Sequence, residues 1–474
     1  MMSVPVGGKG AGSWDAVKAS SIYAVVLAVT LVTLPPNSLA LAVAFFNAAI
    51  QELQTPERWD GRIYFALAIV LTVLLLMLHP RSIIRRALYY APLVLLYRAY
   101  RAPLGDQTAT TASTGSYQFG ILLASWTMRI LDRLYLNDPE TAFRYKGEED
   151  TSPVNYTSSQ KLFWALELMV VTRGIGWNWQ IRQIPAMPQL SRGGFLLWKA
   201  KSAVVTIIVL YAIRDASALL VQLFDGLDDR TGSLAAALLH PVCLHVFMYT
   251  SWAFVVFSSL NLAENFFALF FVGFRITERW SKVDMWPSVF GDVRTSYSIR
   301  RGWGVFWHQN MRHVCQSPGN FIVRNISFLR EPESRLALLT RRYLRLMLIF
   351  VFSGLIHAGG SIYMTQRETN VHDGGNTIGF IYQGLSLIGE DIVLWWLNID
   401  DSKPTSLMRR LVGFGLVHGY ASYATPTLKV IPLAIDHGLE VPGNLLMSGV
   451  KMVGMGANGV LKNPFATMVG SFNV

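Results

Sequence analysis

Charged side chains and cysteine are both scarce in this sequence, and each scarcity excludes a class of protein. Of the 474 residues, only 15% are Asp, Glu, Lys or Arg, whereas 52% are apolar, and the mean hydropathy is +0.35. A chain of this composition is too apolar and too poorly charged for an ordinary soluble domain. The 2 cysteines, Cys243 and Cys315, are too few and too far apart for a disulfide framework or a zinc site, so we expect no bound metal.

Long runs without charge are abundant instead. Five runs free of Lys, Arg, Asp and Glu reach the roughly 17 residues that a spanning helix needs, namely 19–51, 63–80, 231–263, 346–366 and 411–428. Weaker candidates are 87–97, 117–128 and 441–460, together with 202–224, which Arg214 and Asp215 interrupt, and 374–397, which Glu390 and Asp391 interrupt. We therefore expect an all-α protein, a polytopic transmembrane helical bundle of about eight spans that lies in a lipid bilayer. At the N-terminus we expect an uncleaved first helix, broken at Pro35 and Pro36, although a cleaved signal peptide is the alternative.

The basic residues gather in one segment. Between Arg275 and Arg345 there are 13 Lys and Arg against 5 Asp and Glu, which gives this segment +8 of the chain's formal net charge of +11. A segment this basic is expected to face the cytosol. The charge is explained either by topology alone or by a polyanionic ligand such as a CoA thioester, whose phosphates arginine binds well. Nucleic acid is not expected, because apolar residues interrupt the basic ones throughout.

One histidine lies where lipid is expected. His357 is near the middle of the uncharged run 346–366, within the small-residue sequence "FSGLIHAGG" at 352–360. An ionisable residue at that depth is a functional candidate, and histidine is well suited to proton transfer near neutral pH. The glycines on both sides allow another helix or a ligand to approach closely. The alternative is a structural histidine that is hydrogen-bonded to a neighbouring helix.

Four spaced motifs carry a resemblance to a known family. They are "RGIGWNWQIRQIP" at 173–185, "WPSVFGDVRTSYSIRRGWGVFWHQ" at 286–309, "FSGLIHAGG" at 352–360 and "QGLSLIGEDIV" at 383–393. Together they resemble the wax-synthase-like branch of the membrane-bound O-acyltransferases, in particular fungal acyltransferases of terpenoid and meroterpenoid pathways. The resemblance covers about residues 115–430, which we expect to be the acyltransferase core. It leaves 1–114 as N-terminal transmembrane helices and 431–474 as a C-terminal hydrophobic segment.

The resemblance implies an acyl-CoA-dependent O-acyltransferase of the endoplasmic reticulum membrane that acts in secondary metabolism. It has no bound cofactor and uses an acyl-CoA, which we expect to be acetyl-CoA, as co-substrate. The acceptor is expected to be a hydrophobic, terpenoid-like alcohol. His357 corresponds to the family's intramembrane histidine, and His308 with Gln309 corresponds to its polar partner.

The proposed reaction assigns roles to further residues. His357 is expected to remove the proton of the attacking hydroxyl, and the thioester oxygen requires donors such as Gln309, Asn310, a tryptophan N–H or a protonated His308. No serine or cysteine nucleophile is required, and Cys315 is the strongest candidate for one because it follows His313 by two residues. We therefore expect direct transfer.

Substrate contacts are expected at several positions. Arg300 and Arg301 are expected to hold the phosphates of CoA, while Trp303 and Trp307 line the tunnel or simply anchor at the interface. Glu390 and Asp391 orient a histidine, or form an ion pair with an arginine such as Arg173. The complete set of expected substrate and CoA contacts is Arg300, Arg301, Trp303, Trp307, Asn310, Arg173, Trp177, Glu390 and Asp391.

Two alternatives remain from the sequence. The first is a long-chain wax-ester synthase. The second is a non-enzymatic transporter or lipid-binding protein, in which His357, Glu390 and Asp391 form a proton or substrate pathway. The basic segment with its aromatic motifs and the lack of a repeated half favour the enzyme.

Overall fold

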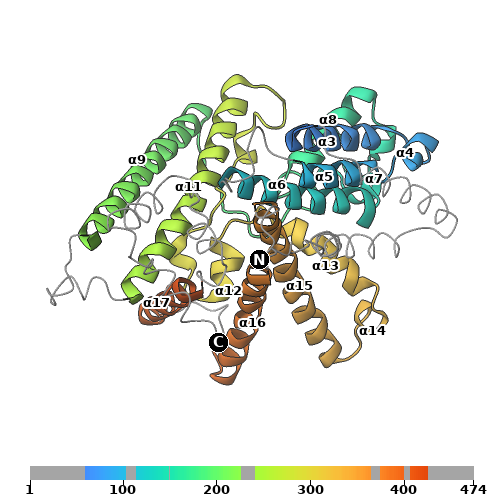
Figure 1. Cartoon of the computed structure of the whole chain (residues 1–474). Helices are drawn as coiled ribbons and strands as arrows, with labels where there is room; N and C mark the ends of the chain where they lie inside the picture. Colours follow the sequence, from blue (N-terminus) through green and yellow to red (C-terminus); the bar gives the residue numbers. More distant parts are fainter. Residues whose placement is uncertain are drawn as a thin grey trace, which may run out of the picture.

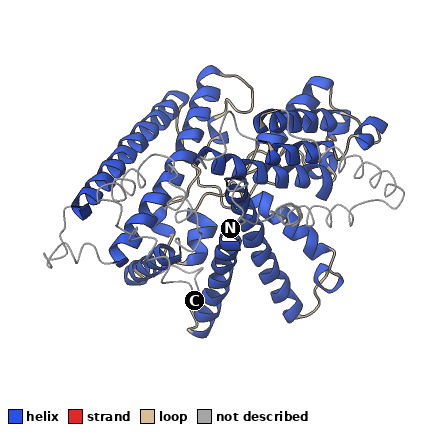
Figure 2. Ribbon diagram, viewed as in Figure 1, coloured by secondary structure: helices blue, strands red, loops and turns tan. Residues whose placement is uncertain are grey.

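The computed structural model describes residues 59–102, 114–148, 150–225, 241–364, 374–399 and 406–424. These residues form helices joined by short loops, and the described part contains no β-strand beyond one isolated bridge between Tyr145 and Trp177 (Figure 2). The longer helices are α3 (Gly61–Met77), α6 (Thr114–Ile130), α9 (Arg192–Asp225), α11 (Pro241–Phe274), α15 (Arg335–Met364), α16 (Gly374–Trp396) and α17 (Leu407–Ala424) (Figure 1). Shorter helices include α4 (Ile83–Ala87), α5 (Ala91–Arg101), α7 (Pro139–Ala142), α8 (Ser158–Val170), α12 (Ile299–Arg301), α13 (Arg312–Arg324) and α14 (Ser327–Arg330).

Four helical segments in the described residues are long and apolar enough to cross a membrane. They are Arg192–Ile213, Tyr249–Phe274, Arg335–Tyr363 and Thr377–Trp396, and Gly61–Met77 is a shorter apolar helix. The expectation of an all-helical membrane protein is therefore confirmed, while a total of about eight spans stays a prediction. The expected helix over 19–51 and the expected C-terminal segment 431–474 lie outside the described residues.

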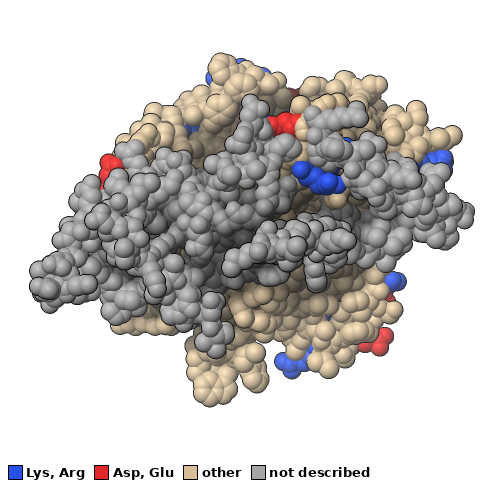
Figure 3. Space-filling view, viewed as in Figure 1, with Lys and Arg blue, Asp and Glu red and all other residues tan. Residues whose placement is uncertain are grey.

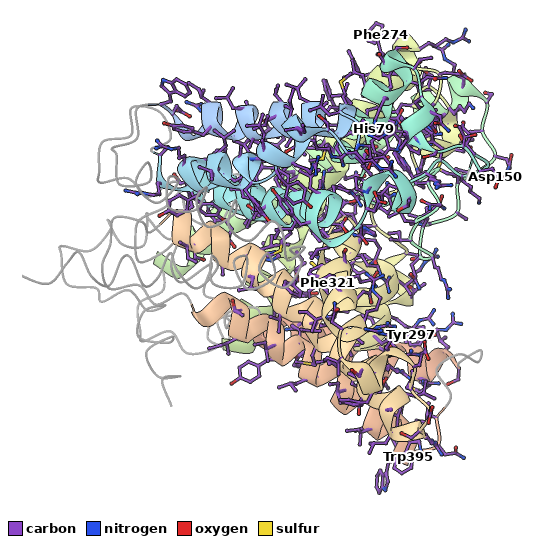
Figure 4. The ribbon with its side chains drawn as sticks, turned by 90° about the vertical axis from the view of Figure 1, so that its right-hand side faces the viewer. His79, Asp150, Phe274, Tyr297, Phe321 and Trp395 are labelled. Atoms are coloured by element: carbon purple, nitrogen blue, oxygen red, sulfur yellow. The ribbon has the colours of Figure 1, made fainter. Side chains whose placement is uncertain are left out.

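Large apolar side chains cover the outside of these helices. Leu197 on α9, Leu416 on α17 and Trp395 on α16 are each at least 70% exposed, as lipid-facing residues are. In the view of Figure 3, the visible described surface is mostly tan, with a few scattered charged side chains. In Figure 4, Phe274 at the end of α11 and Trp395 near the end of α16 lie at opposite edges of the molecule.

Helix α15 is the central element, because α6, α13 and α16 all pack against it. Glycines allow these close crossings. A Cβ atom on Gly354 would lie 2.8 Å from the Cα atom of Thr377 on α16, and one on Gly359 would lie 2.6 Å from the Cβ atom of Ala124 on α6. The expectation that the glycines around His357 permit close helix approach is confirmed.

Helices α9 and α11 form a second unit, seen at the left of Figure 1. Lys199 on α9 donates to both carboxylate oxygens of Glu264 on α11 at 2.7 Å, and both side chains are buried. Nearby, Asn261 donates to Thr206 at 2.8 Å. These bonds satisfy polar groups that would otherwise be exposed to lipid, and they explain why both helices extend beyond the candidate spans 202–224 and 231–263.

Replacing Gly359 by leucine is expected to destabilise the protein, because the new side chain collides with Tyr100 on α5 and Ala124 on α6. Overpacking of this kind costs about 1–3 kcal/mol. The thermal unfolding midpoint of the purified protein in detergent should therefore fall by several degrees. Gly415→Leu on α17 is the matched control, since a Cβ atom there has nothing within 4 Å. Equal losses in the two variants would contradict the close crossing.

Candidate active site

His357 faces the packing surface between α15 and α16. Its Nδ1 atom lies 2.8 Å from the backbone carbonyl oxygen of Ser353, one turn earlier in α15. Because a carbonyl oxygen only accepts hydrogen bonds, Nδ1 carries the hydrogen, and the lone pair is therefore on Nε2. The imidazole ring also packs on Phe380 of α16, with ring centroids 4.5 Å apart. The histidine is thus held in one orientation and one tautomer, with Nε2 able to accept a proton.

The segment that carries His308 is an irregular turn. After α12, residues Gly302–Phe306 form a π-helical turn, η6, which ends at Trp307. The Gly291 N–H donates to the Phe306 carbonyl at 2.9 Å, and a Cβ atom on Gly291 would collide with the Val305 carbonyl oxygen. Glycine at position 291 therefore lets the segment 286–291 lie directly against the turn.

Gln309 braces the same turn. Its Nε2 donates to the carbonyl oxygens of Trp303 at 3.0 Å and Trp307 at 2.6 Å, and its Oε1 accepts from Arg312 at 2.7 Å. Both amide hydrogens are therefore used within the protein. The geometry favours a positioning role for Gln309 over the expected role as an oxyanion donor.

His308 is half-buried, and its Nδ1 atom is buried without a hydrogen-bond partner among the described residues. Burial, followed by the nearby charges of His357 and Arg173, lowers the pKa of His308 to about 3. His308 is therefore neutral at physiological pH, so the structure disfavours the protonated form considered from the sequence. A series of ring contacts connects His357 to His308 through Phe380, Trp303 and Trp307, so that a shared site for the two histidines stays a prediction that this packing supports.

Glu390 and Asp391 on α16 hold the start of this segment. The Glu390 carboxylate accepts the backbone N–H groups of Ile299 at 2.7 Å and Arg300 at 2.8 Å. Asp391 forms a two-point ion pair with the Arg300 guanidinium at 2.9 and 2.6 Å. We call these contacts of Glu390 and Asp391 with residues 299 and 300 the latch. It fixes α12, and with it the turn that leads to His308.

The latch bears on two expectations from the sequence, one about the partner of Glu390 and Asp391 and one about the role of Arg300. The two acidic residues do not pair with Arg173, whose guanidinium instead donates to the carbonyl oxygens of Ser288 at 2.7 Å and Pro287 at 2.8 Å. Arg300, which we expected to hold CoA phosphates, has its charge balanced by Asp391. Asp391 also accepts from Arg342 at 3.0 Å.

The remaining expected site residues divide into two groups. Trp303 lies close to the site, because its ring packs on Phe380, the residue that contacts His357, and its Nε1 donates to Gln383 at 3.3 Å. Trp307 packs between Trp303 and His308. Trp177, in contrast, is buried in the core against Tyr145.

Arg301 and Asn310 complete the expected set. The Arg301 Nε atom donates to the Thr295 carbonyl at 3.0 Å, and its guanidinium lies over the Tyr297 ring. The Asn310 Oδ1 atom accepts from Thr172 at 3.4 Å. Asn310 thus lies beside the start of the "RGIGWNWQ" segment, where its amide N–H groups form no hydrogen bond to a described residue.

Cys315 is not a reactive thiol in this structure. It is 1% exposed within the main hydrophobic core, and burial raises its pKa to about 12. The expectation of direct transfer therefore meets no competing nucleophile at this position. Sequence reasoning did not single out Phe380, Gln383 or the Ser353 carbonyl. Gln383 and Ser353 lie within the quoted motifs, but their contacts with Trp303 and His357 are seen only in the folded chain.

An all-helical membrane protein with a tautomer-fixed histidine beside a second, neutral histidine is suited to transfer between two bound substrates. Residues 286–382, which include both histidines, match the membrane bound O-acyl transferase family. No solved structure matches the chain.

Curated relatives extend the match over most of the chain. An O-mevalon transferase of Penicillium terrestre is 32% identical over 420 residues, which cover 86% of this chain and 94% of the relative. An O-mevalon transferase of Aspergillus niger is 30% identical, over 80% of this chain and 86% of the relative. An acetyltransferase of Arthrobotrys oligospora is 26% identical, over 78% and 80%. The chain belongs to the membrane bound O-acyl transferase family and is an acyltransferase, which confirms the resemblance.

The latch can be tested by a double-mutant cycle. If Arg300 serves to fix α12 through Asp391, Arg300→Ala and Asp391→Ala should each lower turnover by about tenfold to a hundredfold, because the reacting groups are misplaced. The double variant should then be little worse than either single variant. Arg342→Ala, which removes a more exposed partner of the same carboxylate, should have a smaller effect. A rise in KM for acyl-CoA in Arg300→Ala alone would instead indicate contact with the donor.

Proposed function

We propose that this protein transfers a short acyl group from a CoA thioester to a hydroxyl group of a hydrophobic, terpenoid-like alcohol, in a fungal secondary pathway at the endoplasmic reticulum membrane. The observation that carries the proposal is the pair of half-buried histidines within the family match. His357 keeps a free Nε2 lone pair, and His308 keeps an unbonded Nδ1 atom. Relatives named as acetyltransferases and O-mevalon transferases support this class of reaction.

Proton transfer starts at His357. As the hydroxyl oxygen of the alcohol attacks the thioester carbonyl carbon, Nε2 of His357 takes the hydroxyl proton. The protein fixes Nδ1–H on the Ser353 carbonyl, so the imidazolium that forms keeps that hydrogen bond. When the tetrahedral intermediate collapses, the carbon–sulfur bond breaks, and the departing thiolate of CoA takes the proton from Nε2. The products are an ester and free CoA, and His357 returns to its initial state.

The negative charge of the intermediate is stabilised by the segment after η6. A neutral His308 has one ring N–H to donate to the oxyanion. The amide N–H groups of Asn310 are also uncommitted to described residues, unlike those of Gln309. We assign His308 and Asn310 as donors and Gln309 as the residue that positions them.

The identity of the acyl group has two candidates. Acetyl is the group named by several relatives, including those of Arthrobotrys oligospora and Hericium erinaceus. A mevalonyl group, which is larger and carries hydroxyl groups, is favoured by the two relatives with 32% and 30% identity. Both are short compared with the chains that wax-ester synthases transfer.

A donor and acceptor panel tests the proposed function. Membranes that contain the protein are incubated with acetyl-CoA, mevalonyl-CoA or palmitoyl-CoA, together with terpenoid alcohols or hexadecanol. We expect ester formation and release of free CoA thiol from a short donor only when a terpenoid alcohol is present. Ester formation only from palmitoyl-CoA and hexadecanol would contradict the proposal and identify a wax-ester synthase.

Removing His357 tests the mechanism. His357→Ala should leave the protein in the membrane but lower turnover by about 10²-fold or more, the scale expected for loss of a positioned base. His308→Ala should also impair turnover. The matched control is His418→Ala on α17, because His418 bonds Ser296 at 3.0 Å and Tyr249 at 3.3 Å in a structural role. That control should lower the unfolding midpoint and keep near-normal turnover per folded molecule, whereas near-normal turnover in His357→Ala would refute the mechanism.

A further inference from the structure

A pocket with a volume of about 380 Å³ lies along one face of α13, the helix on which Figure 4 labels Phe321. Its size is at the small end of the range of about 300–1,000 Å³ typical of small-molecule sites. The face of α13 in this pocket is polar at helical spacing, and Arg345 of α15 completes it. The lining residues used below are His313, Gln316, Ser317, Asn320, Arg324 and Arg345.

The arginines of this pocket lack acidic partners. Within the described part of the chain, the exposed Arg324 side chain donates only to the carbonyl oxygen of Asn320 in its own helix, at 3.3 Å. The Nε atom of Arg345 is buried without a hydrogen-bond partner, and the positive charges of Arg324 and Arg341 act on it. No carboxylate in the described residues forms an ion pair with any of these three arginines. A cluster of like charges beside a pocket favours the binding of an anion there.

The opposite end of the pocket is rigid, and its negative charge is already balanced. His313 Nε2 lies 3.0 Å from Oδ2 of Asp132, which also accepts from Arg133 at 2.6 Å. The Arg133 guanidinium is held between the rings of Phe143 and Trp179, at 4.3 and 4.4 Å from their centroids. Because Arg133 pairs with the Asp132 carboxylate at 2.6 Å, the negative charge of Asp132 is offset before an anion enters from the arginine end.

The position of the pocket along α15 relates it to the reaction. Arg345 precedes His357 by twelve residues in the same helix, which corresponds to about 18 Å along the helix axis. Twelve residues also leave a net rotation of about 120° between the two side chains, so a ligand with its phosphates at Arg345 and its reacting carbonyl at His357 needs an extended arm that passes around α15. The pantetheine arm of CoA has this form.

We infer that the α13 pocket binds the phosphate groups of a ligand, with Arg324 and Arg345 as the binding residues and the side-chain amides of Gln316 and Asn320 as additional donors. Two sources share this chemistry: the 3′-phospho-ADP part of the CoA donor, which rests on the proposed function, and the headgroup of an anionic phospholipid. The assignment replaces Arg300, whose charge Asp391 already balances.

Binding of CoA to the full-length protein in phosphatidylcholine nanodiscs tests the inference. Arg324→Gln and Arg345→Gln should each weaken CoA binding, measured by calorimetry, by about tenfold or more, because a charge-assisted contact is lost. The affinity for dephospho-CoA, which lacks the 3′-phosphate, should fall by a smaller factor in these variants. Arg335→Gln is the matched control, since Arg335 is an exposed arginine at the start of the same helix, and it should change the CoA affinity by less than about twofold.

A second arm identifies the source of the phosphate. The same variants are placed in nanodiscs that contain a phosphatidylinositol phosphate, and bound lipid is counted by native mass spectrometry. Loss of CoA binding with unchanged lipid binding supports the donor, and the reverse result supports a lipid headgroup. If neither probe binds more weakly in either variant, the inference is wrong.

A labelling experiment covers the case in which an arginine variant fails to fold. In Asn320→Cys combined with Cys243→Ser, a soluble thiol reagent should label position 320, while the native Cys315 is buried. CoA or the phosphoinositide should protect this position, and labelling that neither slows would overturn the inference. Acyl transfer by the unaltered protein is measured separately, so a pocket that binds CoA without transfer refutes only the proposed function.

Discussion

The absence of water in the lipid core is the constraint on which the rest of the structure depends. A histidine in that environment must have one ring nitrogen bonded within the protein, and the Ser353 carbonyl provides this bond to His357. The bond would have no catalytic value if the ring could turn freely. Close packing prevents that, because Gly354 brings α16 near enough for Phe380 to lie on the imidazole. The glycines that permit helix association therefore also hold the base in its orientation.

The second histidine lies on an irregular segment, so its position depends on side chains from elsewhere in the fold. Glu390 and Asp391 fix the start of that segment, and Gln309 fixes its end by bonding two carbonyl oxygens that a regular helix would have satisfied. These contacts hold the segment in place, but none of them involves the reacting atoms. A π-helical turn costs backbone hydrogen bonds, and a site that retains one needs such bracing.

The sequence predicted what depends on local pattern and missed what depends on partners. The depth of His357 and the close approach at its glycines follow from one uncharged run, and both were predictable. The ends of α9 and α11 were not, because Lys199 and Glu264 each interrupt an uncharged run and only their pairing across the two helices keeps them in the membrane. The partner of Arg300 was missed for the same reason, since Asp391 is 91 residues away. The polar face of α13 was concealed by Pro318, which suggests a break where the helix continues.

The arginines fall into two groups: those that form ion pairs with carboxylates of the protein, and those that are available to bind a ligand. Arg85 is paired with Glu140, Arg133 with Asp132, and Arg300 with Asp391, so each of these cations is neutralised within the protein. In a medium of low dielectric constant such pairs are costly to separate, and an arginine engaged in one is poorly suited to bind an incoming anion. Arg324 and Arg345 differ because no described carboxylate neutralises them, although they lie beside each other at a pocket. The basic segment from Arg275 to Arg345 therefore contains two kinds of arginine. One kind stabilises the fold around the histidines, and the other is expected to bind a phosphate group of the substrate or of a membrane lipid.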